Sequence, residues 1–190
     1  MKSTIKMGRL ECIIGPMFSG KSTELIRRLH KEQSIKKRII AINYIDDNRY
    51  SSKPVVATHS GLTVESLKVK RLNDIDINLF NQYDSVFIDE AQFFSDLYDV
   101  VRMLVDTFDK HVVVAGLDGD MNRKPFGEII QLIPICDSVD KLTAYCNKCN
   151  DGTCAPFTIR KDNSTRIGEL IDIGHSDKYI PVCRFHYFSC

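Results

Sequence analysis

Short apolar runs alternate with charged and turn-forming segments along the first three quarters of the chain. Five of these runs have the length and the boundaries of β-strands, namely residues 10–15, 38–44, 85–90, 111–116 and 141–146. They are apolar almost without interruption, and strands of this kind are covered on both faces in parallel sheets. The pattern therefore predicts an α/β fold built on a parallel sheet.

Two helices are predicted from apolar positions that recur every three or four residues. In the segment 21–33, these positions are Leu25, Ile26 and Leu29. The segment 95–110 carries a longer apolar stripe, which we interpret as core packing, and Ser95 is the expected N-cap. The stripe consists of Leu97, Val100, Val101, Leu104, Val105 and Phe108.

The character of the sequence changes after Cys146. Gly, Asn, Asp, Ser and Pro become frequent there, and the strand signals weaken. We therefore expect a boundary near residue 145, with a larger domain at 1–145 and a small module at 146–190.

Composition and charge narrow the class of protein. Of 190 residues, 43% are hydrophobic and 27% are charged, which is ordinary for a globular protein. The 26 basic and 25 acidic residues leave no charge excess for nucleic acid or membrane binding. No apolar run approaches the ~20 residues of a membrane span, and the N-terminal one is too short for a signal peptide. We expect a cytoplasmic location, and neither nucleic acid nor membrane as a partner.

A phosphate-binding loop is predicted between the first strand and the first helix. Gly15-x4-Gly20-Lys21-Ser22 fits the Walker A pattern, and its setting between strand and helix argues against a chance match. Glycines allow successive backbone N–H groups to face one concavity, where the helix N-terminus adds partial positive charge. In such loops the lysine reaches the β- and γ-phosphates, and the Ser22 hydroxyl is a Mg²⁺ ligand. We therefore expect binding of nucleotide phosphates with Mg²⁺.

Two adjacent carboxylates follow another predicted strand. Asp89 is placed as the acid that holds Mg²⁺, directly or through water, and Glu90 faces the crevice at the carboxyl edge of the sheet. The alternative interpretation is that the two carboxylates lie in a solvated turn. We favour the catalytic interpretation, because the pair follows a buried strand in a chain that also has a phosphate-binding loop. Glu90 then activates either a water, as in an ATPase, or a substrate hydroxyl, as in a kinase.

The letters DEAQ at 89–92 also occur in helicases. A helicase of that kind needs two motor domains, for which 190 residues are too few, and a basic surface to follow a nucleic-acid strand. The helicase hypothesis is therefore weak.

Seven cysteines, an odd number, include one pair with metal-ligand spacing. Cys146-x-x-Cys149 and Cys183-x-x-His186 are separated by 33 residues, and four such ligands complete a tetrahedral zinc site. A redox pair is the alternative for Cys146 and Cys149 alone. A zinc ribbon that binds nucleic acid is another alternative, but residues 146–190 carry almost balanced charge. Cys154, His175 and Cys190 are less well spaced ligands, and Cys12 and Cys136 are expected in the core.

The 33 residues between the two ligand pairs form a long connection. Loops of this length are usually functional lids or disordered segments. Because metal ligands anchor both ends of this one, we interpret it as a lid. A kinase needs such a cover to exclude water, whereas an ATPase admits water.

Six segments in a fixed order are specific enough to suggest a family. They read GPMFSGKSTELIRR, YIDDNRYSS, IDEAQFF, LDGDMNRKPFG, KLTAYCNKC and IGHSDKYIPVCRFHYF. Together they resemble the zinc-containing thymidine kinase family, the class related to the cytosolic human enzyme, over nearly the whole chain. The resemblance implies phosphorylation of thymidine at its 5′-hydroxyl by Mg-ATP, with deoxyuridine a poorer substrate. It also implies a homotetramer and a lasso-like loop over the nucleoside.

The resemblance also implies roles for individual residues. Glu90 is expected as the general base for the 5′-hydroxyl, and Asp47 and Arg49 are expected beside the transferred phosphate. The nucleotide-binding set is Gly15, Pro16, Met17, Phe18, Ser19, Gly20, Lys21, Ser22, Asp47, Asn48, Arg49, Asp89 and Gln92. The nucleoside-binding set is Met17, Leu117, Met121, Phe126, Thr158, Leu170, Ile171, Asp172, Ile173, Gly174 and Tyr179. Without the resemblance, the apolar members would be interpreted as ordinary core.

The chain departs from the family pattern at a few positions. Met121 stands where the human-like enzymes have a phenylalanine beside the base, so base discrimination is expected to be looser. Asp172 replaces a more usual apolar residue in the lasso, and His186 replaces the more common fourth cysteine. The sequence leaves two rivals, a nucleotide-driven ATPase or switch protein and a zinc-ribbon nucleic-acid binder.

Overall fold

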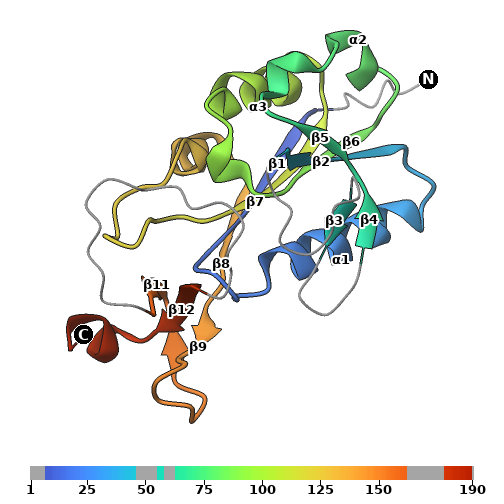
Figure 1. Cartoon of the computed structure of the whole chain (residues 1–190). Coiled ribbons are helices and arrows are strands. Elements are labelled where there is room, and N and C mark those ends of the chain that lie inside the picture. Colours follow the sequence, from blue (N-terminus) through green and yellow to red (C-terminus); the bar gives the residue numbers. More distant parts are fainter. Residues whose placement is uncertain (1–6, 46–54, 58–62, 162–177, 190) are drawn as a thin grey trace.

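A six-stranded parallel sheet forms the centre of the fold (Figure 1). The computed structural model describes residues 7–45, 55–57, 63–161 and 178–189. The strands lie in the order β5-β2-β6-β7-β1-β8 and every neighbouring pair is parallel. Their bounds are β1 (Arg9–Ile14), β2 (Ile39–Tyr44), β5 (Leu67–Val69), β6 (Ser85–Ile88), β7 (His111–Gly116) and β8 (Ser138–Lys141). The α/β class predicted from the apolar runs is confirmed.

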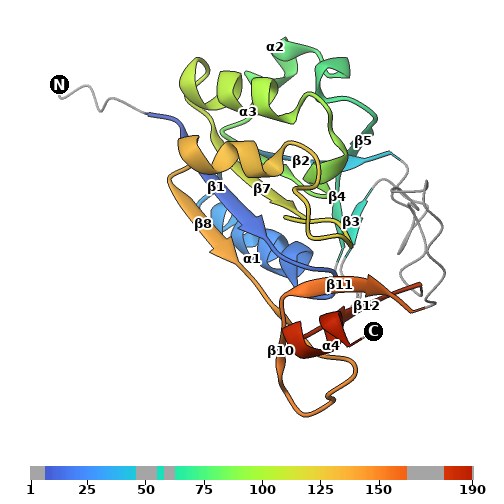
Figure 2. The same ribbon diagram turned by 90° about the vertical axis from the view of Figure 1, so that its left-hand side faces the viewer.

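Helices cover both faces of the sheet. Figures 1 and 2 show α1 (Lys21–Gln33) on one face and α3 (Leu97–Asp106) on the other. The bounds of α1 are those predicted from the sequence. Shorter helical segments complete the domain: α2 (Ile77–Phe80) and the 3-10 helices η1 (Leu72–Asp74), η2 (Ala91–Phe93) and η3 (Ile129–Ile135).

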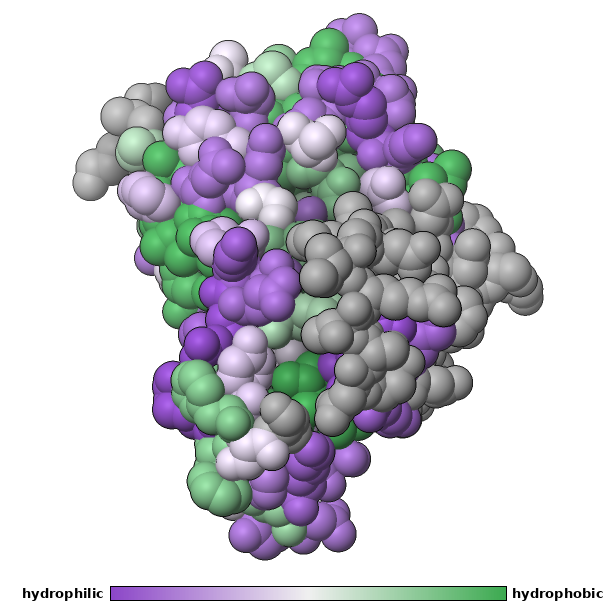
Figure 3. Space-filling view, turned by 60° about the vertical axis from the view of Figure 1, so that its left-hand side comes forward, coloured by the Kyte–Doolittle hydropathy of each residue, from purple (hydrophilic) through white to green (hydrophobic). Residues whose placement is uncertain are grey.

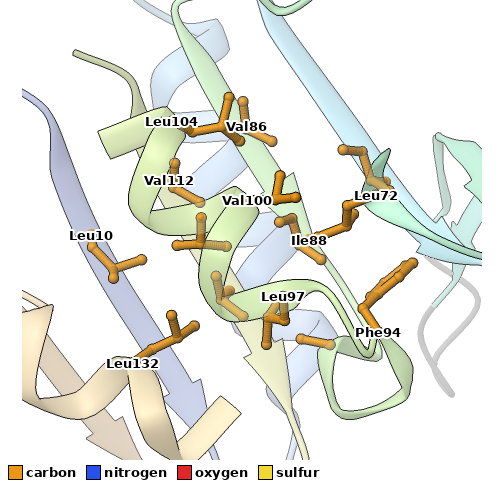
Figure 4. Packing of buried hydrophobic residues seen from close by; sticks show 14 of the residues in the cluster. Leu10, Leu72, Val86, Ile88, Phe94, Leu97, Val100, Leu104, Val112 and Leu132 are labelled. Carbon is orange, nitrogen blue, oxygen red and sulfur yellow. The ribbon is translucent and has the colours of Figure 1, made fainter. Parts of the chain in front are cut away.

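The inner strands β1, β2, β6 and β7 contribute to two cores, because successive side chains point to opposite faces. On the α1 side, Leu25, Ile26 and Leu29 pack with Phe87 and Val113. On the α3 side the core is larger, and Figure 4 shows α3 over β6 and β7. That core includes Leu10, Val86, Ile88, Phe94, Leu97, Val100, Leu104, Val112 and Leu132. The apolar stripe is core packing, as predicted.

The start of α3 differs from the prediction. Asp96, and not Ser95, occupies the N-cap position, and its side chain makes no cap hydrogen bond. The Asp96 carboxylate instead accepts hydrogen bonds from the backbone N–H groups of Leu72 (3.2 Å) and Asn73 (2.9 Å) in η1. Phe108 lies beyond the end of α3 and is only half-buried. The prediction of Ser95 as the N-cap is therefore wrong, because a long-range contact fixes the position of this turn.

The prediction of one strand at 141–146 is also wrong. The chain there belongs to two sheets, because β8 ends at Lys141 and β9 (Ala144–Tyr145) pairs with β10 (Cys154–Ala155). Leu142 still donates a backbone hydrogen bond to Ile14 (2.8 Å) before the chain leaves the sheet. As an edge strand, β8 is largely exposed, and its sequence SVDK lacks the apolar run that identified the inner strands.

The C-terminal module has a small core of its own. In it β9 pairs with β10, β11 (Phe157–Arg160) pairs with β12 (Tyr179–Val182), and α4 (Arg184–Phe188) follows. Its buried residues are Ala144, Cys146, Ala155, Ile180, Val182 and Cys183. The connection interpreted as a lid therefore has strands at both ends, and its middle lies outside the described residues. A separate hairpin pairs β3 (Val55–Ala57) with β4 (Thr63–Glu65).

The surface is mixed in polarity. On the face shown in Figure 3, hydrophilic residues predominate at the two ends, and smaller groups of hydrophobic residues lie between them. None of the described helices has the length and the apolar character that a membrane span requires.

We predict that Asp96→Ala lowers the free energy of unfolding by about 1–3 kcal/mol, because it leaves the N–H groups of Leu72 and Asn73 without their acceptor. Asp99→Ala on the same helix is the control, since that side chain is 81% exposed. Its effect should stay within about 0.5 kcal/mol. Urea unfolding measures both, and equal effects would contradict a structural role for Asp96.

Candidate active site and metal centre

Three neighbouring strands bring the predicted site residues to one edge of the sheet. In the register, Ile14 of β1 lies opposite Gly116 of β7, and Ile88 of β6 lies opposite Val114. The carboxyl ends of β1, β6 and β7 therefore meet. In open α/β sheets this edge is where ligands bind.

Backbone conformation explains why glycines are needed in the phosphate-binding loop. Gly15 has φ +150°, and a Cβ there would lie 2.4 Å from the carbonyl oxygen of Leu142. Gly20 has φ +84° and caps the N-terminus of α1 in the left-handed conformation. The loop is thus held by a close backbone approach at one end and a left-handed turn at the other.

Lys21 holds its ammonium group over this loop. The side chain is buried, and its Nζ donates to the carbonyl oxygen of Pro16 at 2.7 Å. The Ser19 hydroxyl donates to the same oxygen at 2.8 Å. Ser22, the next residue of α1, is half-buried. A positive charge therefore lies at the helix N-terminus, where the Walker A motif places phosphate.

Glu90 is buried directly after β6, in an unusual backbone conformation. Its φ of +52° lies in the left-handed region, which costs a non-glycine residue about 1–3 kcal/mol. Gln92 Nε2 donates to Glu90 Oε2 at 2.7 Å, and Gln92 Oε1 accepts from the backbone N–H of Leu117 at 2.9 Å. Because Oε1 must face that N–H donor, Nε2 must face Glu90. The Gln92 amide thus fixes the orientation of the carboxylate.

Two glycines leave room for Gln92. A Cβ on Gly116 would lie 2.6 Å from Gln92 Oε1, and a Cβ on Gly127 would lie 2.1 Å from the Gln92 carbonyl oxygen. Gly127 also has φ +63°. Gln92 was expected to contact the nucleotide, and that contact stays a prediction. Its bonds to Glu90 and Leu117 were not foreseen, since the amide is oriented by Leu117, which is 25 residues away in sequence.

An aromatic cluster lies at the 3-10 helix that follows Glu90. Phe93 packs edge-on against Phe126, with centroids 5.6 Å apart, and in a tilted arrangement against Tyr44, with centroids 5.2 Å apart. The segment 118–126 forms a closed loop, in which Asp120 Oδ1 accepts from the N–H groups of Asn122 and Lys124, both at 2.8 Å. The loop therefore contacts, through Phe126, the aromatic cluster at η2, the segment that directly follows Glu90.

The C-terminal module contacts both sides of the candidate site. Thr158 Oγ1, on β11, accepts from the backbone N–H of Met17 in the phosphate-binding loop at 3.0 Å. The Tyr187 hydroxyl, on α4, donates to the carbonyl oxygen of Met121 at 2.9 Å. The sequence predicted Thr158 and Met121 as site residues, but not Tyr187.

The structure brings part of the predicted set together and leaves part untested. Asp47, Asn48 and Arg49 lie outside the described residues, as do Leu170–Gly174 of the predicted lasso. Tyr179 is half-buried on β12, opposite Arg160 of the neighbouring strand. Their proposed contacts with ligands remain predictions.

The four predicted metal ligands converge in the module. The ligand atoms of Cys146, Cys149, Cys183 and His186 all lie within 4.8 Å of one another. His186 Nδ1 is 3.5, 3.3 and 3.4 Å from the sulfurs of Cys146, Cys149 and Cys183. Ligands about 2.0–2.3 Å from one zinc ion in a tetrahedron lie about 3.3–3.8 Å apart. The arrangement fits zinc, with His186 binding through Nδ1.

The environment of Cys146 favours the thiolate that zinc requires. Burial raises its pKa, but hydrogen bonds from the backbone at Cys183, Cys149 and Lys148 outweigh this and lower it to about 6. Cys154 is exposed and does not belong to the cluster, so it is not a ligand in this arrangement. Cys12 is buried, as expected, whereas Cys136 is only partly buried.

Comparison with known proteins gives a consistent result. The family described as thymidine kinase matches residues 8–187. Thymidine kinase a of Arabidopsis thaliana is 44% identical over 186 residues, which cover 96% of this chain and 76% of that protein. The cytosolic thymidine kinase of Homo sapiens is 41% identical over 182 residues, covering 96% and 74%. The thymidine kinase of vaccinia virus (strain Western Reserve) is 41% identical over 182 residues, covering 96% and 98%.

We predict about one zinc ion per chain in protein purified without chelators, since the donor set closes a structural tetrahedral site. Elemental analysis measures it. Cys183→Ser should lower the zinc content and expose the module to proteolysis, whereas Cys154→Ser should change neither. Zinc-free folded protein, or equal zinc in both variants, would contradict the assignment.

Proposed function

The chain belongs to the thymidine kinase family, and we propose that it transfers the γ-phosphoryl group of Mg-ATP to the 5′-hydroxyl of thymidine. Deoxyuridine is the expected poorer substrate. The observation that carries this proposal is the Glu90 carboxylate, which is buried at the same edge of the sheet as the phosphate-binding loop and oriented by Gln92. A buried, oriented carboxylate at this edge suits a general base for a substrate hydroxyl.

The phosphate-binding loop supplies the nucleotide site in this proposal. The backbone N–H groups between Gly15 and Gly20 would hold the phosphate oxygens, and Lys21 would neutralise the β- and γ-phosphates. The Ser22 hydroxyl and the buried Asp89 carboxylate are hard oxygen donors, which fit Mg²⁺. When bound, Mg²⁺ neutralises charge on the phosphates. Asp47, Asn48 and Arg49 would add contacts to the phosphates.

Glu90 would receive the proton of the 5′-hydroxyl as the oxygen attacks the γ-phosphorus. The hydrogen bond from Gln92 keeps the carboxylate from turning away, and Leu117 keeps Gln92 in place. Preorganisation of this kind reduces the reorganisation that the reaction requires. Gln92 therefore has a positioning role in addition to any contact with the nucleotide.

The nucleoside pocket is proposed between the loop 118–126, β11 and β12. Met17, Leu117, Met121 and Phe126 are half-buried and belong to none of the three hydrophobic clusters. This observation supports a pocket wall over ordinary core. Thr158, Tyr179 and the lasso residues Leu170–Gly174 would complete the pocket, with the lasso backbone hydrogen-bonded to the pyrimidine.

Other features of the protein are proposed on the family likeness or on the sequence. These are the homotetramer, the cytoplasmic location and the division into a kinase domain (1–145) and a zinc-binding lid module (146–190). The separate cluster of buried residues in the module supports the division.

We predict that γ-labelled ATP transfers its label to thymidine and, more slowly, to deoxyuridine. A panel of nucleosides separated by chromatography identifies the acceptor. Label found only in free phosphate, whichever nucleoside is present, would contradict the kinase proposal and favour the ATPase rival.

We predict that Glu90→Gln lowers kcat by about 10²–10⁴-fold, because it removes the proton acceptor but keeps the shape of the side chain. The dissociation constant for ATP should stay within about threefold, since the phosphate-binding loop is intact. Glu65→Gln, at an exposed position on β4, is the matched control and should leave kcat unchanged. Near-normal turnover of Glu90→Gln would show that another group is the base.

A further inference from the structure

Arg123 lies in the loop 118–126 and reaches into the C-terminal module. Its guanidinium carbon lies 4.4 Å from the ring centroid of Tyr187, 4.7 Å from that of Phe188 and 5.6 Å from that of Phe157. All three distances are within the range of cation–π attraction. Among the residues that the structure describes, Arg123 has no ion pair, and its guanidinium contacts these three rings.

The three rings form one group, of which Phe157 lies on β11 and the other two lie on the segment that carries Cys183 and His186. Phe157 packs against Tyr187 with centroids 5.2 Å apart, and Tyr187 packs against Phe188 with centroids 5.5 Å apart. Tyr187 and Phe188 lie on α4, whose N-cap is Cys183 and which also carries His186. The position of the rings therefore depends on the turn that two of the four metal ligands fix.

A second contact joins the same loop to the same ring. The Tyr187 hydroxyl donates to the carbonyl oxygen of Met121, two residues before Arg123, at 2.9 Å. Tyr187 thus contacts the loop through its hydroxyl and through its ring face. Met121 itself is half-buried.

The loop backbone is strained at the residue that makes the contact. Arg123 has φ +60°, a conformation in which Asn or Gly is more usual. Strained residues persist when the surrounding structure determines their conformation. The Asp120 carboxylate and the aromatic rings provide this support.

We propose that Arg123 is a positioning residue, which fastens the loop carrying Met121 to the metal module and thereby raises the affinity for the nucleoside. The inference rests on the proposed function in one respect, since it places Met121 against the base. The proposal adds a physical connection between the metal centre and the nucleoside pocket. Arg123 and Tyr187 make this connection without contacting the metal or the nucleoside themselves.

The contact is distinct from two other arginine–aromatic pairs among the described residues. Arg184 stacks on Phe157 at 4.9 Å, entirely within the module. Arg102 lies 5.8 Å from the ring centroid of Tyr98, and both belong to α3. Neither joins the module to the loop, so both serve as controls for the loss of a cation–π contact.

The test compares Arg123→Asn with Arg184→Gln and Arg102→Gln. Asparagine tolerates the left-handed conformation, so Arg123→Asn removes the guanidinium and leaves the turn unstrained. We expect KM for thymidine to rise about three- to tenfold, with kcat and KM for ATP within about twofold. Tyr187→Phe, which removes only the hydrogen bond to Met121, should change KM for thymidine in the same direction. The two controls should leave it unchanged.

Amide hydrogen exchange of the segment 117–126 in ligand-free protein gives a readout that does not depend on activity. Arg123→Asn, and removal of zinc from the unmutated protein, should each accelerate exchange there, while the zinc content of Arg123→Asn stays normal. Unchanged exchange in Arg123→Asn, an equal rise in KM for ATP, or loss of zinc would overturn the proposal. If the unmutated chain does not phosphorylate thymidine, the proposed function fails, and exchange alone decides whether Arg123 fastens the loop.

Discussion

The close approach of two backbone segments at Gly15 is the constraint on which the rest of the site depends. Leu142 donates its N–H to the carbonyl of Ile14, and its own carbonyl oxygen occupies the space that a Cβ on Gly15 would need. This contact holds the start of the phosphate-binding loop. It also directs the chain from β8 toward the C-terminal module. One backbone contact thus places both the phosphate-binding loop and the root of the metal module.

The C-terminal module, which has one small core, contacts the candidate site on two sides. Thr158 accepts a hydrogen bond from the phosphate-binding loop, and Tyr187 donates one to the loop at Met121. A 45-residue module buries little apolar surface, so metal ligation supplies much of the stability that such a unit needs. In the proposed function, a zinc ion held by these four ligands would therefore have a structural role that extends to the geometry of the nucleoside pocket. Nucleoside binding would then depend on a metal that takes no part in the reaction.

The sequence predicted features that depend on local patterns, and missed those that depend on distant contacts. The bounds of α1 and the cluster of metal-ligand residues followed from spacing alone. A helical repeat of apolar residues and two pairs of ligands three residues apart can both be recognised within a short stretch of sequence. The strand β8 was misplaced because an exposed edge strand carries no apolar run. The roles of Asp96, Gln92 and Arg123 could not be predicted, since each depends on a partner far away in sequence. Asp96 binds the backbone of Asn73, Gln92 binds the backbone of Leu117 at the end of another strand, and Arg123 contacts Phe157.

A polar network on the α1 face of the sheet links the same elements a second time. The Arg28 guanidinium, on α1, binds Glu11 of β1 and Asp140 of β8, each at 2.6 Å. Burial opposes the charge of Arg28, but the hydrogen bonds that its guanidinium donates to the carboxylates raise its pKa above the usual value. The side chains of Arg28 and Glu11 are 15% and 10% exposed, so removing either one leaves its partner largely buried without a counter-charge, which is destabilising, although the intact pair adds little net stability. The Arg28 network instead fixes the relative position of two elements. It joins α1, which follows the phosphate-binding loop, to β8, the strand that leads to Leu142. The phosphate-binding segment and the β8 segment are therefore held together twice, by the backbone contact between Gly15 and Leu142 and by the ion pair between Arg28 and Asp140.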